Sequence, residues 1–288
     1  MNIHSGRVLP LVDQMIGTRS LPVRIAIFGS RHDNWSLKNL QRPEDAETYP
    51  EFVARIRAAI SGIGGGRIFA PNPVAPSTGA ICQQEDLIRH IDLGGRMEMH
   101  RNQDLHADGS FLRQMGDTGI FSAGGCGMLI AIRGTSVVFA HVSRESVFDR
   151  IAVMSRGERQ DESRPYFGVA EAAIAALDAK EHPDEVFAWP LFGLPPDSFE
   201  HSFEHSQYGA FNIALGEYLE AHHSRTAAPI TDDAVYPDLS QLVRERLELA
   251  GVPHGQICMD HAYVPETVPT TRNGGGSARY LVAAVREG

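Results

Sequence analysis

Two apolar runs in the middle of the chain constrain the fold more than any other feature. Residues 128–132 have the sequence MLIAI and residues 136–141 the sequence SVVFAH, with Arg133-Gly134-Thr135 between them. Short runs rich in β-branched and aromatic residues, separated by two or three residues that include glycine, are typical of a β-hairpin. The sequence therefore predicts a pair of antiparallel strands here.

Helix and strand patterns interleave along the rest of the chain. Apolar residues at helical spacing predict helices over 51–63, 167–179 and 207–222, and over a segment with Asp238 as N-cap and Gly251 as terminator. Strands are predicted over 22–28, 186–189, 255–260 and 279–285. Because the spacing is not that of regular strand–helix–strand units, we expect one mixed α+β domain. It should span 21–288, after an N-terminal extension over 1–20.

Composition and charge limit the classes of partner. A chain of 288 residues with 42% hydrophobic and 22% charged residues is typical of a globular protein. No apolar run reaches 18 residues and residues 1–20 lack a signal-peptide pattern, so we expect neither a membrane span nor secretion. The net charge of −10 and the lack of a basic block argue against a nucleic-acid partner.

The cysteines and histidines indicate where chemistry could occur. Three cysteines, at 82, 126 and 258, are too few for a disulfide framework and indicate a reducing, cytoplasmic setting. Cys82 and Cys258 are expected to be packing thiols. Thirteen histidines are numerous for this length, but those in FEHSFEH at 199–205 are expected in a solvated loop.

Chain geometry brings Cys126 close to His141 within the predicted hairpin. If Arg133 and Gly134 form a two-residue turn, these two side chains face each other across the ladder. Cys126 also lies in AGGCG, residues 123–127, where glycines leave room for a substrate. A thiol beside an imidazole can form a reactive thiolate pair or ligate a metal. It can equally be a small buried side chain beside a hydrogen-bonded histidine.

Short motifs spread over most of the chain resemble those of one protein family. They include FGSR at 28–31, ADG at 107–109, the cysteine at 126, AH at 140–141, GLP at 193–195 and TR at 271–272. In this order they resemble the bacterial laccase-domain proteins, also called polyphenol oxidase-like or purine nucleoside phosphorylase-like proteins. The fold group also includes cysteine–histidine deamidase toxins. The resemblance implies mixed β-sheets flanked by helices and a zinc ion bound by two histidines and a cysteine.

The resemblance also implies roles for individual residues. Cys126 and His141 would be two of the three zinc ligands. The segment NPVA at 72–75, where the family's remaining histidine is expected, has no histidine, so His90 or His100 would have to supply the third ligand.

Other residues would contact the substrate. Arg272, and with it Arg144, would contact phosphate or a purine base. His261 lies near the family's substrate contacts.

Three functions remain open at this point. The first is a zinc-dependent purine nucleoside phosphorylase or adenosine deaminase-like enzyme, with a purine nucleoside and phosphate as small-molecule substrates. The second is a hydrolase or amide deamidase with Cys126 as nucleophile and His141 as base. The third is a non-catalytic binding protein. In each case we expect a cytoplasmic protein without a nucleic-acid or membrane partner, and the oligomeric state stays open.

Overall fold

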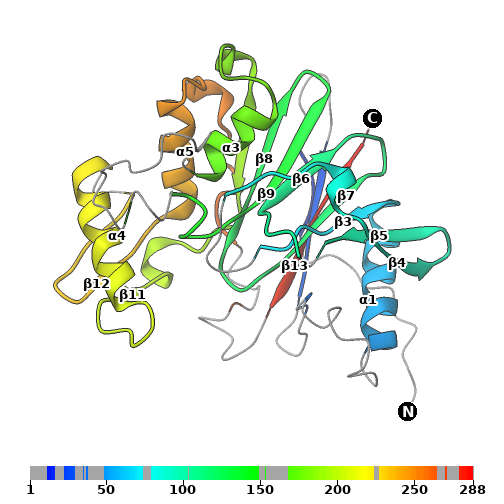
Figure 1. Cartoon of the computed structure of the whole chain (residues 1–288), viewed down its shortest axis with the longest axis horizontal. Helices are drawn as coiled ribbons and strands as arrows, with labels where there is room; N and C mark the ends of the chain where they lie inside the picture. Colours follow the sequence, from blue (N-terminus) through cyan, green and yellow to red (C-terminus); the bar gives the residue numbers. More distant parts are fainter. Residues whose placement is uncertain are drawn as a thin grey trace.

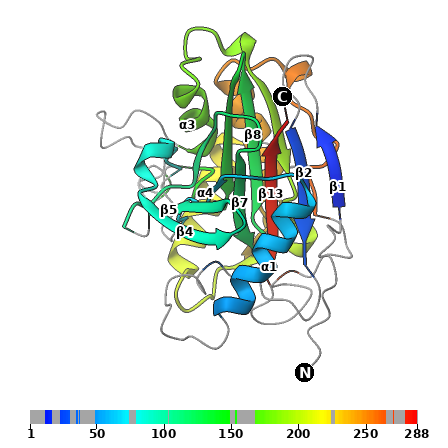
Figure 2. The same ribbon diagram turned by 90° about the vertical axis from the view of Figure 1, so that its right-hand side faces the viewer.

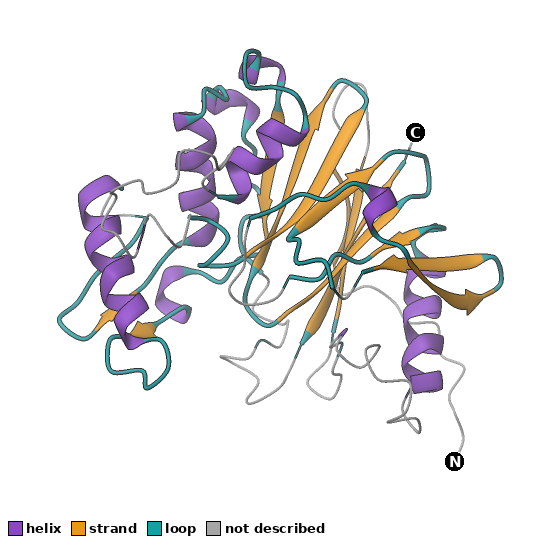
Figure 3. Cartoon of the chain, viewed as in Figure 1, coloured by secondary structure: helices purple, strands orange, loops and turns teal. Residues whose placement is uncertain are grey.

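Two β-sheets packed face to face form the body of the protein, with helices outside both (Figures 1 and 3). The computed structural model describes residues 12–16, 23–29, 35, 37, 49–73, 79–102, 104–148, 153, 168–223, 227–264, 270 and 279–287. The predicted mixed α+β domain is confirmed by this architecture. No helix in these ranges is long and apolar enough to cross a membrane.

The larger sheet has seven strands within the described residues. In spatial order they are β1 (Val12–Ile16), β2 (Val23–Phe28), β13 (Tyr280–Arg286), β7 (Thr118–Ala123), β3 (Ile68–Phe69), β5 (Met97–Arg101) and β4 (Arg89–Gly94). β3 is parallel to both of its neighbours and the other pairs are antiparallel, so the sheet is mixed. β1 lies inside the predicted extension over 1–20 but pairs with β2, so this part of it belongs to the sheet.

The smaller sheet contains the central hairpin. Its order is β10 (Phe187–Leu191), β8 (Gly127–Arg133), β9 (Ser136–Val142) and β6 (Gly109–Leu112). The hairpin prediction is confirmed, but the turn lies one residue later than expected, at Gly134 and Thr135. Gly134 adopts a φ of +57°, as the first position of a tight hairpin turn requires.

This turn changes the expected register. Met128, not Cys126, lies directly opposite His141. Because the shift is by two residues, and side chains alternate between faces with a period of two, Cys126 stays on the same face as His141. The predicted proximity therefore survives the wrong register.

Helices cover the outer faces of both sheets. α1 (Tyr49–Gly62) packs across the larger sheet (Figure 2). Its residues Phe52, Ile56 and Ile60 are buried in one cluster with residues of that sheet. α3 (Val169–Ala176) and α5 (Leu239–Leu249) cover the smaller sheet. α4 (Gly209–His222) packs on a small sheet of β11 (His201–Ser202) and β12 (Ala234–Val235). Short 3-10 turns span Gln84–Asp86, Pro183–Glu185, Pro196–Ser198 and His254–Gln256.

Most predicted elements are present, and one is wrong. Asp238 caps α5 as expected, because its side chain accepts a hydrogen bond from the backbone N–H of Gln241 at 2.9 Å. The strand predicted over 255–260 is a 3-10 turn followed by a single bridge between Ile257 and Ala188. Pro253, at the extended N-cap of that turn, starts it and leaves no length for a ladder.

Candidate active site

Cys126 lies in the short glycine loop that joins β7 to β8. Gly125 has a φ of +149°, and a Cβ there would lie 2.6 Å from Cδ1 of Leu194, so only glycine fits. The backbone N–H of Leu194 donates to the Gly125 carbonyl at 3.2 Å. The Tyr280 hydroxyl donates to the Cys126 carbonyl at 2.9 Å. The loop therefore holds a half-buried thiol at a fixed place between the two sheets.

His141 and Asp108 complete the surroundings of this thiol. His141 lies near the end of β9 and Asp108 lies just before β6, the next strand of the sheet. The Cys126 thiol lies close enough to the His141 imidazole for each group to shift the pKa of the other. Nδ1 of His141 lies 3.3 Å from Oδ1 of Asp108, so Nε2 is the ring nitrogen that the carboxylate does not contact. We call these three residues the Cys–His–Asp triad.

Asp108 is held firmly enough to orient the imidazole. It is 1% exposed, and its other carboxylate oxygen accepts a hydrogen bond from the Gly79 backbone N–H at 2.8 Å. The Asp108 backbone carbonyl accepts from the His141 N–H at 2.7 Å. The Phe121 ring lies against the imidazole, with ring centroids 5.7 Å apart. These contacts fix the orientation of the His141 ring.

The charges of the pair favour a thiolate and an imidazolium. Burial by itself raises the pKa of Cys126, but the charge and hydrogen bond of His141 outweigh it and lower that pKa below its usual value. Burial lowers the pKa of His141, whereas the Cys126 thiolate and Asp108 raise it, and the raising contributions prevail. A thiolate at neutral pH is the nucleophilic form of cysteine.

Two arginines add positive charge near the sulfur. The charges of Arg279 and Arg144 both help to lower the pKa of Cys126. Arg144 donates to His201 Nδ1 at 3.0 Å and to Asn212 Oδ1 at 2.6 Å, and its guanidinium lies 4.6 Å from the centroid of the Tyr208 ring. The loop prediction was thus wrong for His201, which is 8% exposed, pairs with Val235 in β11 and accepts the hydrogen bond from Arg144.

The structure places the other predicted site residues elsewhere or beside the site. His261 is half-buried, and its carbonyl accepts from the backbone N–H of Phe192, in the segment that contacts the glycine loop. Arg272 lies outside the described residues. Burial raises the pKa of Cys82 to about 11 and also raises that of Cys258, as suits packing thiols.

A zinc ion does not fit the described residues around Cys126 and His141. Among the residues that the structure describes, the group of three metal-ligating side chains is His90, Glu98 and His100, and it does not include the cysteine. The segment at 72–75, where the family's remaining histidine is expected, has no histidine, and the amide oxygen of its Asn72 accepts from Arg101 at 3.1 Å. Residues 74–78, VAPST, contain no metal-ligating side chain type. Two ligands without a third do not make a zinc site of the expected kind.

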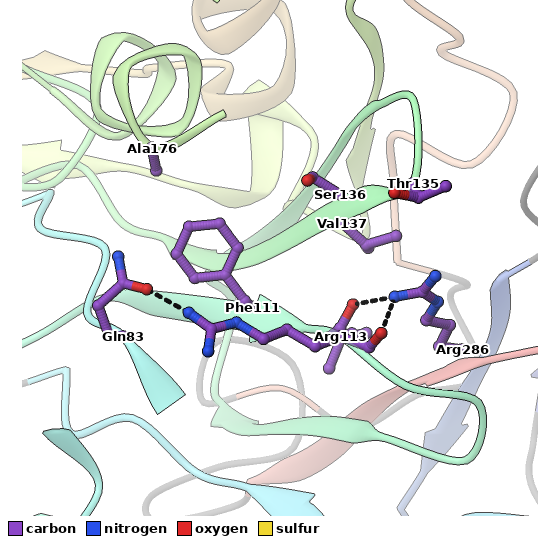
Figure 4. Close-up of a pocket in the computed structure, with 9 residues that line it drawn as sticks. Gln83, Phe111, Arg113, Thr135, Ser136, Val137, Ala176 and Arg286 are labelled. Atoms are coloured by element: carbon purple, nitrogen blue, oxygen red, sulfur yellow. Dashed lines mark hydrogen bonds between the residues drawn. The ribbon is translucent and has the colours of Figure 1, made fainter. Parts of the chain in front are cut away.

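A cavity of about 390 Å³ lies at the other end of the central hairpin (Figure 4). It is lined by Gln83, Phe111, Leu112, Arg113, Thr135, Ser136, Val137, Ala176 and Arg286. Arg286 donates to the carbonyls of Leu112 and Arg113, and Arg113 donates to Gln83. No triad residue lines this cavity, so it is separate from the candidate active site.

Several solved structures resemble nearly the whole chain, and three of them are compared with it below. YlmD from Geobacillus stearothermophilus superposes with a TM-score of 0.60 at 14% identity, covering 96% of this chain and 100% of its own. The chain has the laccase-domain fold. The hypothetical protein YfiH from Bacillus licheniformis has a TM-score of 0.57 at 12% identity, covering 93% and 97%. NMB0706 from Neisseria meningitidis has a TM-score of 0.58 at 15% identity, covering 96% and 99%.

This likeness confirms the laccase-domain resemblance at the level of the fold. No family model matches the sequence, and no curated protein matches it. Function must therefore be argued from the site itself. The residue that sequence reasoning missed there is Asp108, whose signal was its place in the ADG motif at 107–109.

Proposed function

We propose that this laccase-domain chain is an acyl-transfer enzyme with a cysteine nucleophile, a hydrolase or an amide deamidase. The observation that carries the proposal is the Cys–His–Asp triad, in which a buried carboxylate lies against a histidine whose charge lowers the pKa of a neighbouring thiol. A nucleophile, a base and a group that orients the base are the parts that covalent acyl transfer needs.

Each member of the triad has a defined part in the reaction. The Cys126 thiolate attacks the substrate carbonyl carbon and forms a C–S bond, giving a tetrahedral oxyanion. The oxyanion collapses, the bond to the leaving amine or alcohol breaks, and Nε2 of His141 gives that group its proton. Water then attacks the thioester, His141 takes the proton of the water, and the C–S bond breaks to restore the thiolate. Asp108 stabilises the imidazolium whenever it forms.

The positive charge of Arg144 and Arg279 supports a preference among carbonyl substrates. Both lie close enough to the thiol to shift its pKa, so an anionic group bound near the reacting carbonyl would be attracted to the site. A small-molecule amide or ester with a nearby carboxylate or phosphate has this character.

The zinc-dependent purine nucleoside reaction is the second candidate, favoured by the shared laccase-domain fold. It would use the same Cys126 and His141 as ligands, and Arg272 and Arg144 as contacts for the substrate. It lacks a third zinc ligand among the described residues. A chemical assay must separate the two candidates, since they share the same side chains.

The experiment is a covalent trap on metal-free protein. The chain, treated with a chelator and dialysed, is mixed with p-nitrophenyl acetate and with a panel of glutamine and asparagine amides, and intact mass is recorded within seconds. We expect an acyl adduct on Cys126 in the natural chain and none in Cys126→Ser. In parallel, adenosine and inosine with phosphate are followed by HPLC. Zinc-dependent nucleoside turnover with no adduct would overturn the proposal in favour of the second candidate.

A further inference from the structure

A second cluster of chemistry-bearing side chains lies on the β4–β5 hairpin, at the outer edge of the larger sheet (Figure 1). His90 on β4 lies directly opposite His100 on β5, and Glu98 precedes His100 by two residues. Side chains alternate along a strand, so all three project from the same face. Their ligand atoms lie within 4.8 Å of one another.

The distances are close to those that a metal ion needs. Glu98 Oε2 lies 3.8 Å from His90 Nδ1 and 3.8 Å from His100 Nε2. A tetrahedral ion with bonds of about 2.0–2.1 Å places its ligand atoms about 3.4 Å apart. The side chains of His90 and Glu98 are 59% and 57% exposed, so small rotations at the surface can close the remaining gap.

His100 is the fixed member of the cluster. Its ring stacks on Phe69, with centroids 5.0 Å apart and planes at 21°, and its side chain is 13% exposed. Its Nε2 atom is buried and has no hydrogen-bond partner among the residues that the structure describes. A buried ring nitrogen without a partner is unfavourable, and a metal ion between the three side chains would satisfy it.

The charges around His100 are mixed. Burial lowers the pKa of His100 and the charge of His90 lowers it further, whereas Glu98 and Asp117 raise it. Arg67 also lowers this pKa, but its guanidinium pairs with the Asp117 carboxylate at 2.7 Å, which offsets its charge toward an incoming cation.

We propose that His90, Glu98 and His100 bind a divalent transition metal ion, with Zn²⁺ as the ion that this donor set suits. Two imidazoles and one carboxylate leave the fourth tetrahedral position to water or to an outside ligand. The ion would join the edge strand β4 to β5 and thereby stabilise the hairpin. The site shares no residue with the triad, so it does not depend on the proposed function.

The test is calorimetric titration of metal-free protein with Zn²⁺, in a chain that carries Cys126→Ser so that the triad thiol cannot bind the ion. We expect one equivalent of Zn²⁺ per chain. His90→Ala and His100→Ala should each weaken the Kd by about tenfold or more. His182→Ala, at an exposed histidine outside the cluster, is the matched control and should leave the Kd unchanged.

Two further measurements keep the outcome decisive. Co²⁺ bound to the full natural chain at the hairpin should show ligand-field absorption without a sulfur-to-cobalt charge-transfer band. Because His90 is largely exposed, His90→Ala should keep the far-ultraviolet circular dichroism of the parent even if His100→Ala does not. Zn²⁺ binding by His90→Ala as tight as that of its parent, or no binding by the Cys126→Ser chain, would overturn the proposal.

Discussion

Replacing Asp108 with asparagine tests how the triad is activated. Asparagine keeps the size of the side chain and can still accept a hydrogen bond from the Gly79 N–H, but it removes the negative charge 3.3 Å from His141 Nδ1. The imidazolium then loses its carboxylate partner. We expect the pKa of His141 to fall, and the pKa of Cys126 to rise because the thiolate loses part of its counter-charge.

The size of the effect follows from the geometry. Two unit charges at this distance attract by about 5 kcal/mol at an effective dielectric constant of about 20. The dipole of the asparagine amide retains part of this attraction, and the cost of burying the Asp108 charge offsets another part in the natural chain. A net loss of about 1.5–3 kcal/mol is therefore expected, as for one hydrogen bond to a charged group. Acylation near pH 7 should therefore slow by about 10- to 100-fold.

The assay is single-turnover acylation of Cys126 by p-nitrophenyl acetate over a range of pH. Since a raised thiol pKa leaves less thiolate at neutral pH but not at alkaline pH, the deficit of Asp108→Asn should shrink as the pH rises. Asp238→Asn is the control, because Asp238 is similarly buried but caps α5, and asparagine is also a good N-cap. Equal rates for Asp108→Asn and the natural chain, or a deficit that is the same at every pH, would refute this role for Asp108.

Three further predictions concern the support of the site. Gly125→Ala should lower the free energy of unfolding in urea by about 1–3 kcal/mol, because the residue has a positive φ and the new Cβ would clash with Leu194; an unchanged midpoint would contradict this. Tyr280→Phe leaves the carbonyls of Cys126 and Phe192 without its hydroxyl and should cost about 1–3 kcal/mol, with slower acylation; a neutral variant would show that the tyrosine does not hold the loop. Chelation should leave the acylation rate of Cys126 unchanged, and a loss restored by Zn²⁺ would point to a metal at the triad.

Local patterns predicted much of the fold correctly. The central hairpin, the helix capped by Asp238 and the last strand follow from apolar periodicity and cap chemistry over short windows. The β4–β5 hairpin was not predicted, because its face turned away from α1 carries His90, Asp92, Glu98 and His100 and its turn uses three successive positive-φ residues from Gly94. Such a polar edge gives little apolar signal.

The site was predictable as a pair but not as a triad. Cys126 and His141 belong to neighbouring ends of one hairpin, so chain geometry alone brings them together, even with the turn misplaced by one residue. Asp108 reaches His141 only because β6 pairs with β9, and that pairing joins segments far apart in the sequence. The sequence could not show that His90 lies beside Glu98 and His100, since this depends on β4 pairing with β5 at the sheet edge.

The most direct test of the central claim is the pKa of Cys126 in the metal-free natural chain. Alkylation of each cysteine by iodoacetamide, followed by mass spectrometry across pH, gives this value with Cys258 as an internal reference. We expect half-maximal reactivity of Cys126 at a pH below the ordinary thiol value of 9.0, and that of Cys258 above it. A Cys126 that titrates together with Cys258, at or above the ordinary value, would contradict an activated nucleophile.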